Sequence, residues 1–233
     1  MSSNLIKFVS YDEGAAKFYP PIPANKMIPE WYKEVPNELE FMTGYIEKDG
    51  VPSIKRCVPV LDYLTSGYII RSPYQIKIRL DVDDLGIVEC KTITAVEGIV
   101  SQHPYQQCPV HMDGVKNHYF KLANVWKVIT PPGYSCMYYQ PHYFLNNNFQ
   151  LFPSIVDTDG HDDAVNFVGL AKAKSFVINP GDPLMIVYPF KRDDWNHEVE
   201  YNNYTQKNRY KFMLKKMWHG TYSKMFHSKK KFR

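Results

Sequence analysis

Short apolar and alternating runs recur along this chain, and they predict β-strands. Residues 74–80 alternate apolar and charged side chains, as expected of a strand with one buried face. Residues 68–71 form a second strand-like run, and the apolar residues 184–190 are typical of a buried strand. Further strands are expected at residues 87–90, 92–96, 98–100, 120–125, 126–130, 134–140, 149–156, 164–170 and 176–178. A short helix is expected at residues 60–65, ending before Gly67.

Turn-forming sequences separate these runs and indicate the class of fold. Examples are Pro131-Pro132-Gly133 and Asn179-Pro180-Gly181-Asp182. Short strands divided by regular turns are typical of antiparallel sheets, whereas alternating strands and helices would predict a parallel one. We therefore predict a mainly β protein, an antiparallel sandwich or barrel, with no internal repeat.

The N-terminal residues differ from this pattern because they are rich in proline and aromatic side chains. Prolines at this density disfavour helix interiors and central strands. We expect an extended arm over residues 1–53, with one helical turn at 29–33. Its anchors on a partner would be Tyr19, Trp31 and Tyr32.

The C-terminal residues carry a helical pattern and most of the positive charge. Tyr210, Met213, Leu214 and Met217 have the spacing of one apolar helix face. Residues 201–233 contain ten Lys and Arg and no Asp or Glu, so the acidic excess lies in residues 1–200. We expect one β-rich domain over residues 1–204 and a basic helix and tail over 205–233. The tail would dock on protein, with nucleic acid as the alternative partner.

Composition excludes several classes of protein. With 233 residues, 44% hydrophobic and 22% charged, the chain is unlike disordered, collagenous or coiled-coil sequences. No run is long enough to span a membrane, and no apolar leader opens the chain. The four cysteines form no CxxC pair, which favours free thiols over a zinc site.

One set of residues resembles an iron site. His111, Asp113 and His197, followed by Arg209, resemble the HxD…H…R pattern of iron/2-oxoglutarate oxygenases. Two histidines and one carboxylate can bind Fe(II) on one face and leave positions open. This is one hypothesis, and loop histidines on the surface are the other reading. Apart from that iron, the sequence predicts no cofactor.

Three segments resemble the β-clip core of dUTPases and dCTP deaminases. They are residues 130–135, 154–159 and 180–186, in the order of that family. The resemblance implies a β-clip fold and makes Asp157 a candidate water-activating carboxylate. His142 and Tyr143 replace the family's phosphate-binding Arg-Ser, and a Lys-rich helix replaces its Gly-rich arm.

Most of the chain resembles a family of unknown function from tailed phages, notably those of marine cyanobacteria. The matching segments are residues 21–23, 28–33, 54–59, 61–62, 65–70, 124–128, 130–135, 156–159, 181–183, 189–192 and Trp195. The resemblance implies a phage origin and a single domain, and it brings no known activity.

Three hypotheses of function follow. The first is a virion structural protein in the capsid decoration, neck or tail, assembled in the host cytoplasm. Its partners would be other virion proteins and further copies of itself, for which a trimer is one arrangement. The others are a dUTPase-like nucleotide hydrolase and an Fe(II)/2-oxoglutarate oxygenase.

Overall fold

The computed structural model describes residues 4–39, 51–82, 88–94, 96–103, 118–201 and 221–233. The chain divides into two compact units, each built from two stretches of sequence. Unit 1 comprises Met1–Met27 and Gly67–Arg192, and unit 2 comprises Ile28–Ser66 and Asp193–Arg233. The expected boundary between residues 204 and 205 lies outside the described residues.

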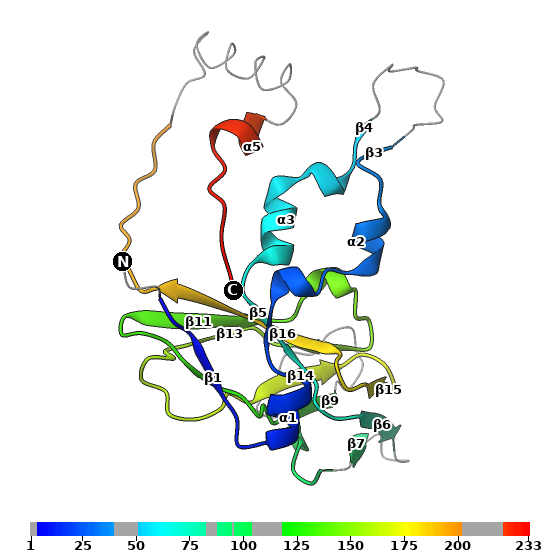
Figure 1. Cartoon of the computed structure of the whole chain (residues 1–233). Coiled ribbons are helices and arrows are strands. Elements are labelled where there is room, and N and C mark those ends of the chain that lie inside the picture. The colour runs from blue at the N-terminus through cyan, green and yellow to red at the C-terminus, as the bar shows by residue number, and fades with distance from the viewer. Residues whose placement is uncertain (1–3, 40–50, 83–87, 95, 104–117, 202–220) are drawn as a thin grey trace. The chain divides into compact units, whose positions relative to one another are not determined.

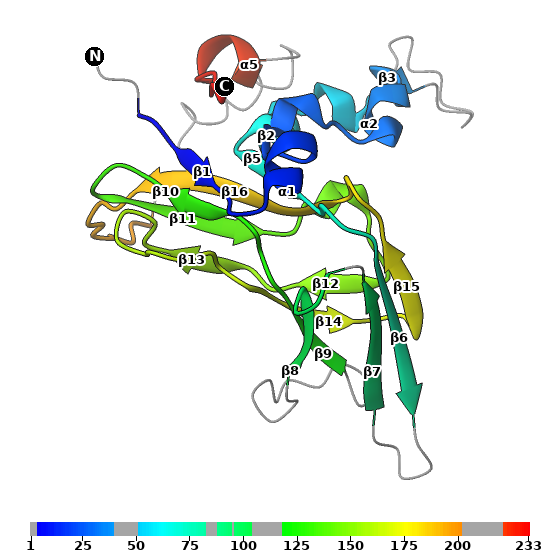
Figure 2. The ribbon, with the colours of Figure 1, turned by 60° about the horizontal axis from the view of Figure 1, so that its bottom comes forward.

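Unit 1 is made of antiparallel β-sheets (Figures 1 and 2). Its strands are β1 (Lys7–Val9), β2 (Ile22–Pro23), β5 (Tyr68–Arg71), β6 (Ile76–Val82), β7 (Val88–Thr94), β8 (Val100–His103), β9 (His118–Leu122), β10 (Lys127–Ile129), β11 (Tyr134–Tyr139), β12 (Phe149–Leu151), β13 (Ser154–Val156), β14 (Phe167–Ala171), β15 (Ser175–Ile178) and β16 (Pro183–Lys191). Its helices are α1 (Glu13–Phe18), η1 (Ala24–Lys26) and η4 (His142–Phe144). The prediction of a mainly β, antiparallel protein is confirmed.

The sheets of unit 1 have orders β13-β11-β16-β5-β2, β12-β14-β9-β8, β15-β6-β7 and β1-β10. The three larger sheets contribute to one apolar core. Ile78 of β6, Tyr138 of β11 and Phe120 of β9 are almost fully buried in it. Lys77 and Arg79 of β6 are exposed, so the alternation of residues 74–80 separates a core face from an outer face as predicted.

Two sheets diverge at Pro153, where the sequence predicted one continuous strand. Residues 149–156 instead form β12 in the four-stranded sheet and β13 in the five-stranded sheet. Proline has no backbone N–H and cannot donate to a strand ladder, so the chain changes partners there. The preceding Phe152 N–H still donates to Val168 O at 2.9 Å. The reverse holds for residues 87–90 and 92–96, which were expected as two strands but form a single strand, β7.

The proline-rich residues 20–23 lead into the edge of the five-stranded sheet. Ile22 and Pro23 form β2, which pairs only with β5 among the described strands. An edge tolerates proline because the missing N–H faces away from the neighbouring strand. Upstream of these prolines, α1 places Ala15 in the core, with Asp12 accepting a hydrogen bond from the Ala15 N–H at 2.7 Å.

The described part of unit 2 contains short helices and one two-stranded sheet. Its elements are α2 (Glu30–Glu34), β3 (Glu38–Leu39), β4 (Val51–Pro52), η2 (Ile54–Arg56), α3 (Val58–Thr65) and α5 (Thr221–Met225). Pro29 precedes α2, where a proline is tolerated because the first turn needs no N–H donor there. Arg56 binds Glu38 at 2.6 Å. The amphipathic helix expected from Tyr210 to Met217 lies outside the described residues.

Candidate functional site

The structure describes only part of the residues that the sequence singled out. His111 and Asp113 lie outside the described residues, as do Tyr210, Met213, Leu214 and Met217. His197 is exposed in a stretch without regular secondary structure. The iron-site hypothesis therefore stays a prediction. Among the described residues, no three His, Cys, Asp or Glu side chains are grouped to hold a metal ion.

The predicted aromatic anchors belong to different units. Tyr19 of unit 1 is half-buried, and the Arg71 guanidinium lies 5.8 Å from the centre of its ring. Trp31 and Tyr32 of unit 2 are in edge-to-face contact with ring centres 5.7 Å apart. Tyr32 is buried, and its hydroxyl donates to Lys55 O at 3.4 Å. These side chains therefore stabilise their own unit, and whether they also contact a partner stays a prediction.

Asp157 follows directly after β13, at the end of the five-stranded sheet. The Ser135 hydroxyl donates to Asp157 Oδ1 at 2.7 Å, and Arg192 Nη1 lies 3.3 Å from the same oxygen. The side chain is 70% exposed. In this structure, the candidate catalytic carboxylate is a hydrogen-bond acceptor that links β11 and β16.

Asp159 is held more tightly than Asp157. Arg192 Nη1 donates to Asp159 Oδ1 at 2.9 Å, and Nη2 donates to Oδ2, which is a bidentate pair. The Gly133 N–H donates to Oδ2 at 2.8 Å. The hydrogen bonds from Arg192 and Gly133 lower the pKa of Asp159 to about 2. Arg192 also donates to Tyr134 O at 3.0 Å and Ser135 Oγ at 3.1 Å, so one guanidinium ties three chain segments together.

These polar contacts follow from the register of three neighbouring strands. Ser135 lies opposite Phe190, and Met137 lies opposite both Ile155 and Tyr188. Continuing the same registers as far as Gly133 brings it level with Asp159 and Arg192, and the Arg192 N–H donates to Gly133 O at 2.9 Å. The sequence pattern indicates Asp157 and places Arg192 in a family-like segment, but no motif in it gives a role to Arg192 or Asp159.

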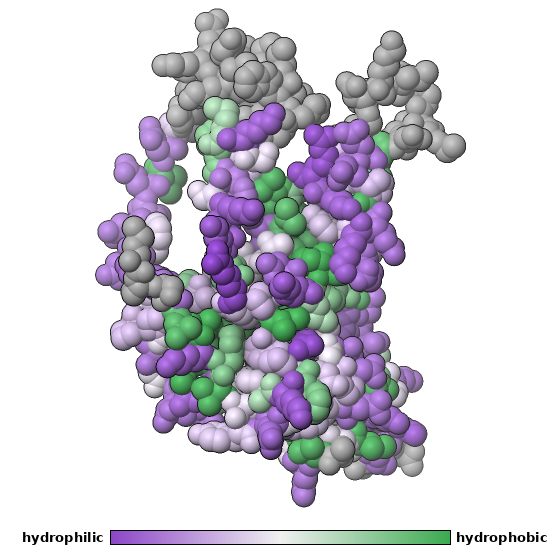
Figure 3. All heavy atoms as spheres, viewed as in Figure 1, coloured by the Kyte–Doolittle hydropathy of each residue, from purple (hydrophilic) through white to green (hydrophobic). Residues whose placement is uncertain are grey.

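Two apolar side chains lie next to Ser135 and Asp157 on the same face of the sheet. Successive side chains on one face are two residues apart, which puts Met137 and Ile155 beside Ser135 and Asp157. Ile155 is 65% exposed and Met137 is 37% exposed. We call Met137, Ile155 and the flanking Asp157 and Arg192 the outer patch. On the face of unit 1 turned toward the viewer in Figure 3, apolar groups are similarly small and surrounded by polar side chains.

Beneath the outer patch, buried hydroxyl and thiol groups join the loop after β13 to the core. Thr158 Oγ1 lies 2.7 Å from Thr130 Oγ1 and donates to Cys136 Sγ at 3.3 Å. Burial raises the pKa of Cys136 to about 11, against a smaller lowering by the Thr158 hydrogen bond. Cys136 is therefore a neutral thiol near neutral pH, a poor nucleophile that contributes to packing.

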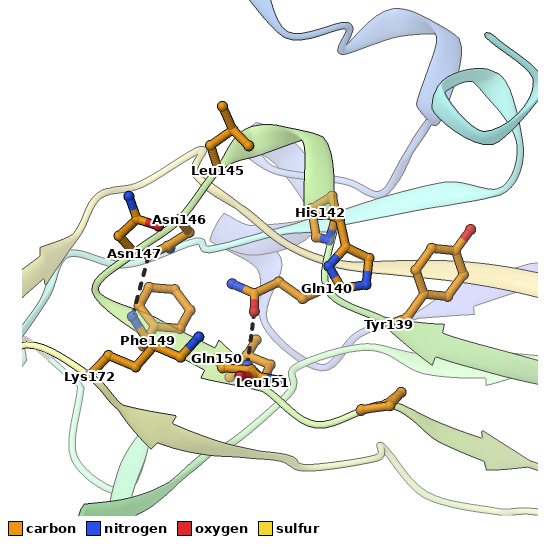
Figure 4. Close-up of a pocket in the computed structure, with 12 residues that line it drawn as sticks. Tyr139, Gln140, His142, Leu145, Asn146, Asn147, Phe149, Gln150, Leu151 and Lys172 are labelled. Carbon is orange, nitrogen blue, oxygen red and sulfur yellow. Dashed lines mark hydrogen bonds between the residues drawn. The ribbon is translucent and has the colours of Figure 1, made fainter. Parts of the chain in front are cut away.

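A pocket of about 330 Å³ opens at the other end of β11 (Figure 4). It is lined by Tyr139, Gln140, Pro141, His142, Leu145, Asn146, Asn147, Phe149, Gln150, Leu151, Pro153 and Lys172. Gln140 Oε1 accepts from Leu151 N–H at 3.0 Å, and Asn146 Oδ1 accepts from Asn148 N–H at 2.9 Å. Two of its amide side chains thus brace the loop between β11 and β12. The lining contains no carboxylate that could serve as a base.

Comparison with other proteins adds no assignment to this geometry. The chain matches no protein-family model and no curated protein. Within the described part of the chain, no helix is long and apolar enough to cross a membrane.

Proposed function

We propose that this protein is a structural component of a phage virion, in the capsid decoration, neck or tail, and that it acts through contacts with other proteins. The observation that carries the proposal is the outer patch. Two exposed apolar side chains, Met137 and Ile155, lie on a sheet face whose end is fixed by the Arg192–Asp159 pair. A rigid surface of apolar side chains with a charged border is typical of protein–protein contacts.

The contacts of the Asp157 carboxylate agree with the proposal. A general base must reach the proton that it abstracts, and it needs partners suited to that task. Asp157 instead accepts from Ser135 of β11 and contacts Arg192, which directly follows β16. We propose that this end of the sheet holds the surface in shape and does not activate water.

The resemblance to the β-clip core of dUTPases supports a shared architecture. The three resembling segments contribute to β11, β13 and β16, which are neighbours in one sheet. We propose that unit 1 is a β-clip-like domain that has been adapted to assembly. The virion would form in the host cytoplasm, and the protein would be present as an oligomer.

Mass spectrometry of purified particles tests the proposal. We expect the protein in clean particles at a fixed ratio to the major capsid protein. Absence from such particles would overturn the virion role.

A variant of the patch tests the surface itself. Ile155→Lys should fold normally, because the side chain is largely exposed, and should lower incorporation into particles. Leu39→Lys, at an exposed apolar position of unit 2, is the matched control and should be incorporated normally. Equal incorporation of both variants would reject the outer patch as the contact surface.

An assay on the purified protein separates the proposal from the hydrolase hypothesis. We expect no pyrophosphate release from deoxynucleoside triphosphates. Release that Asp157→Asn abolishes would establish the hydrolase instead.

A further inference from the structure

Residues 194–201 have the sequence pattern of a β-strand but pair with none of the described strands. Trp195, Val199 and Tyr201 occupy odd positions, and Asp194, Glu198 and Glu200 occupy even positions. This alternation places the apolar side chains on one face of a strand and the acidic ones on the other. The segment follows an extended path (Figure 1, orange) and pairs with no described strand.

The apolar side chains of this segment are unusually exposed. Trp195 is 86% exposed, Val199 is 89% exposed and Tyr201 is 88% exposed. Three large apolar groups on one strand face give up considerable stabilisation while they remain in water. Such a set is typical of a surface that a partner covers.

Arg192, the last residue of unit 1 before the segment, is held in place by its contacts. The Arg192 N–H donates to Gly133 O, and the Arg192 guanidinium binds Asp159. The segment therefore begins two residues after a side chain that unit 1 holds in place.

The chain itself carries a sheet of complementary charge. On the outer face of β15-β6-β7, Val177 lies opposite Lys77, and Lys77 lies opposite Ile93. In the next row, Arg79 lies opposite Lys91, and both contact Asp81, at 2.7 and 2.9 Å. Asp81 in turn lies opposite Glu89, so three cations and two carboxylates leave this face with one net positive charge, and Ile93 and Val177 on it are exposed. Its outer strands, β7 and β15, have no second partner among the described strands.

We infer that residues 194–201 add as a strand to an open edge of the β15-β6-β7 sheet in a second copy of this chain. The acidic side chains then lie on the same outer face as Lys77 and Arg79, two strand spacings or about 10 Å away from β6. Trp195, Val199 and Tyr201 turn toward the opposite face, where Ile76 and Ile78 enter the core. Backbone hydrogen bonds along the edge supply affinity, and the side chains select the register.

Self-association of the purified full chain tests this inference by analytical ultracentrifugation. The wild type should form oligomers at micromolar concentration. The double variant Trp195→Ser/Val199→Ser should weaken association by about 100-fold, since two large apolar side chains no longer become buried. Tyr11→Ser removes an equally exposed aromatic side chain elsewhere and should leave association unchanged.

A charge exchange identifies the acceptor sheet. Glu198→Lys/Glu200→Lys should weaken association by about 10-fold or more. Mixing it at low salt with a Lys77→Glu/Arg79→Glu chain should restore part of the association, because opposite charges again lie on the same face, about 10 Å apart. Lys77 and Arg79 lie on the central strand β6, so the rescue applies whichever edge accepts the segment.

Three results would overturn the inference: a monomeric wild type, an oligomer that persists in the Trp195/Val199 variant, or no rescue by the exchanged charges. Circular dichroism checks that each variant is folded. The inference does not rest on the virion role, because it is tested on purified protein without particles. Absence from virions would reject that role and leave this inference standing.

Discussion

Arg192 binds both carboxylate oxygens of Asp159, and it thereby joins the end of β16 to the loop after β13. This pair and the Gly133 N–H hold the pKa of Asp159 at about 2, below its value in an unfolded chain. A carboxyl whose pKa is lower in the folded state stabilises the fold at pH values above its unfolded pKa. That contribution is lost as pH falls from about 4 toward 2.

Asp159→Asn should therefore lower the melting temperature at pH 7, and the difference from wild type should shrink as pH falls through this range. Thermal unfolding followed by circular dichroism at several pH values measures the effect. Asp157→Asn, at the more exposed carboxylate, is the control and should change the melting temperature less. A difference for Asp159→Asn that is the same at pH 7 and pH 2.5 would argue against an ionic origin.

Gly169 of β14 lies where two large side chains meet, so it has no room for a larger residue. A Cβ there would come within 2.6 Å of Phe120 Cζ and 2.8 Å of Leu151 Cδ2. Gly169→Ala should lower the free energy of unfolding by about 1–3 kcal/mol, the usual cost of overpacking a core. Urea denaturation measures this change. Gly160→Ala, which meets no atom within 4 Å, should have little effect, and equal losses in the two variants would contradict the packing argument.

The two cysteines with described side chains should differ in reactivity. Cys57 is exposed, whereas Cys136 is buried and its pKa is raised to about 11. Because the thiolate is the reactive form, iodoacetamide at pH 7.5 should modify Cys57 and spare Cys136 until the protein unfolds. Mass spectrometry of peptides after brief labelling distinguishes the two sites. Comparable labelling of Cys136 in the native protein would mean that this part of the core opens readily.

One carboxylate of α3 contacts two side chains near the end of the basic tail. His227 Nε2 lies 3.0 Å from Asp62 Oδ1, and Lys230 Nζ donates to Oδ2 at 2.5 Å. Burial alone raises the pKa of Asp62, but the hydrogen bonds from Lys230 and His227 lower it overall. The attachment should therefore persist at neutral pH and weaken as acid protonates Asp62.

Asp62→Asn should release residues 221–233 at neutral pH, which would appear as faster hydrogen exchange and faster trypsin cleavage after Lys229. Glu30→Gln, which removes an exposed ion pair with Lys33 in the same unit, should leave the tail unchanged. Unchanged protection of the tail in Asp62→Asn would show that other contacts hold it.

Local patterns predicted the strands well, and nonlocal contacts limited what sequence could reveal about the site. The strand at residues 68–71 is confirmed at both ends, because the turn at Gly67 precedes it and its apolar residues are contiguous. Residues 149–156 were wrongly predicted as one strand, since nothing local indicates that two different sheets compete for the chain on either side of Pro153. The Arg192–Asp159 pair depends on the register of β11 with both β13 and β16, which no short motif encodes. Asp157 was found because it sits in a family-like segment.

The division of each unit between two stretches of sequence has a consequence for synthesis. All of unit 1 has been translated once Arg192 is made, but unit 2 still lacks the residues from Asp193 onward. Residues 28–66, the first stretch of unit 2, are therefore synthesised more than a hundred residues before the second stretch that completes the unit. Because domains generally fold as units during translation, the β-sheet unit should mature first and the smaller unit last. A chain that ends at Arg192 and is released from the ribosome would hold a complete sheet unit and an incomplete unit 2 that is exposed to proteases and chaperones.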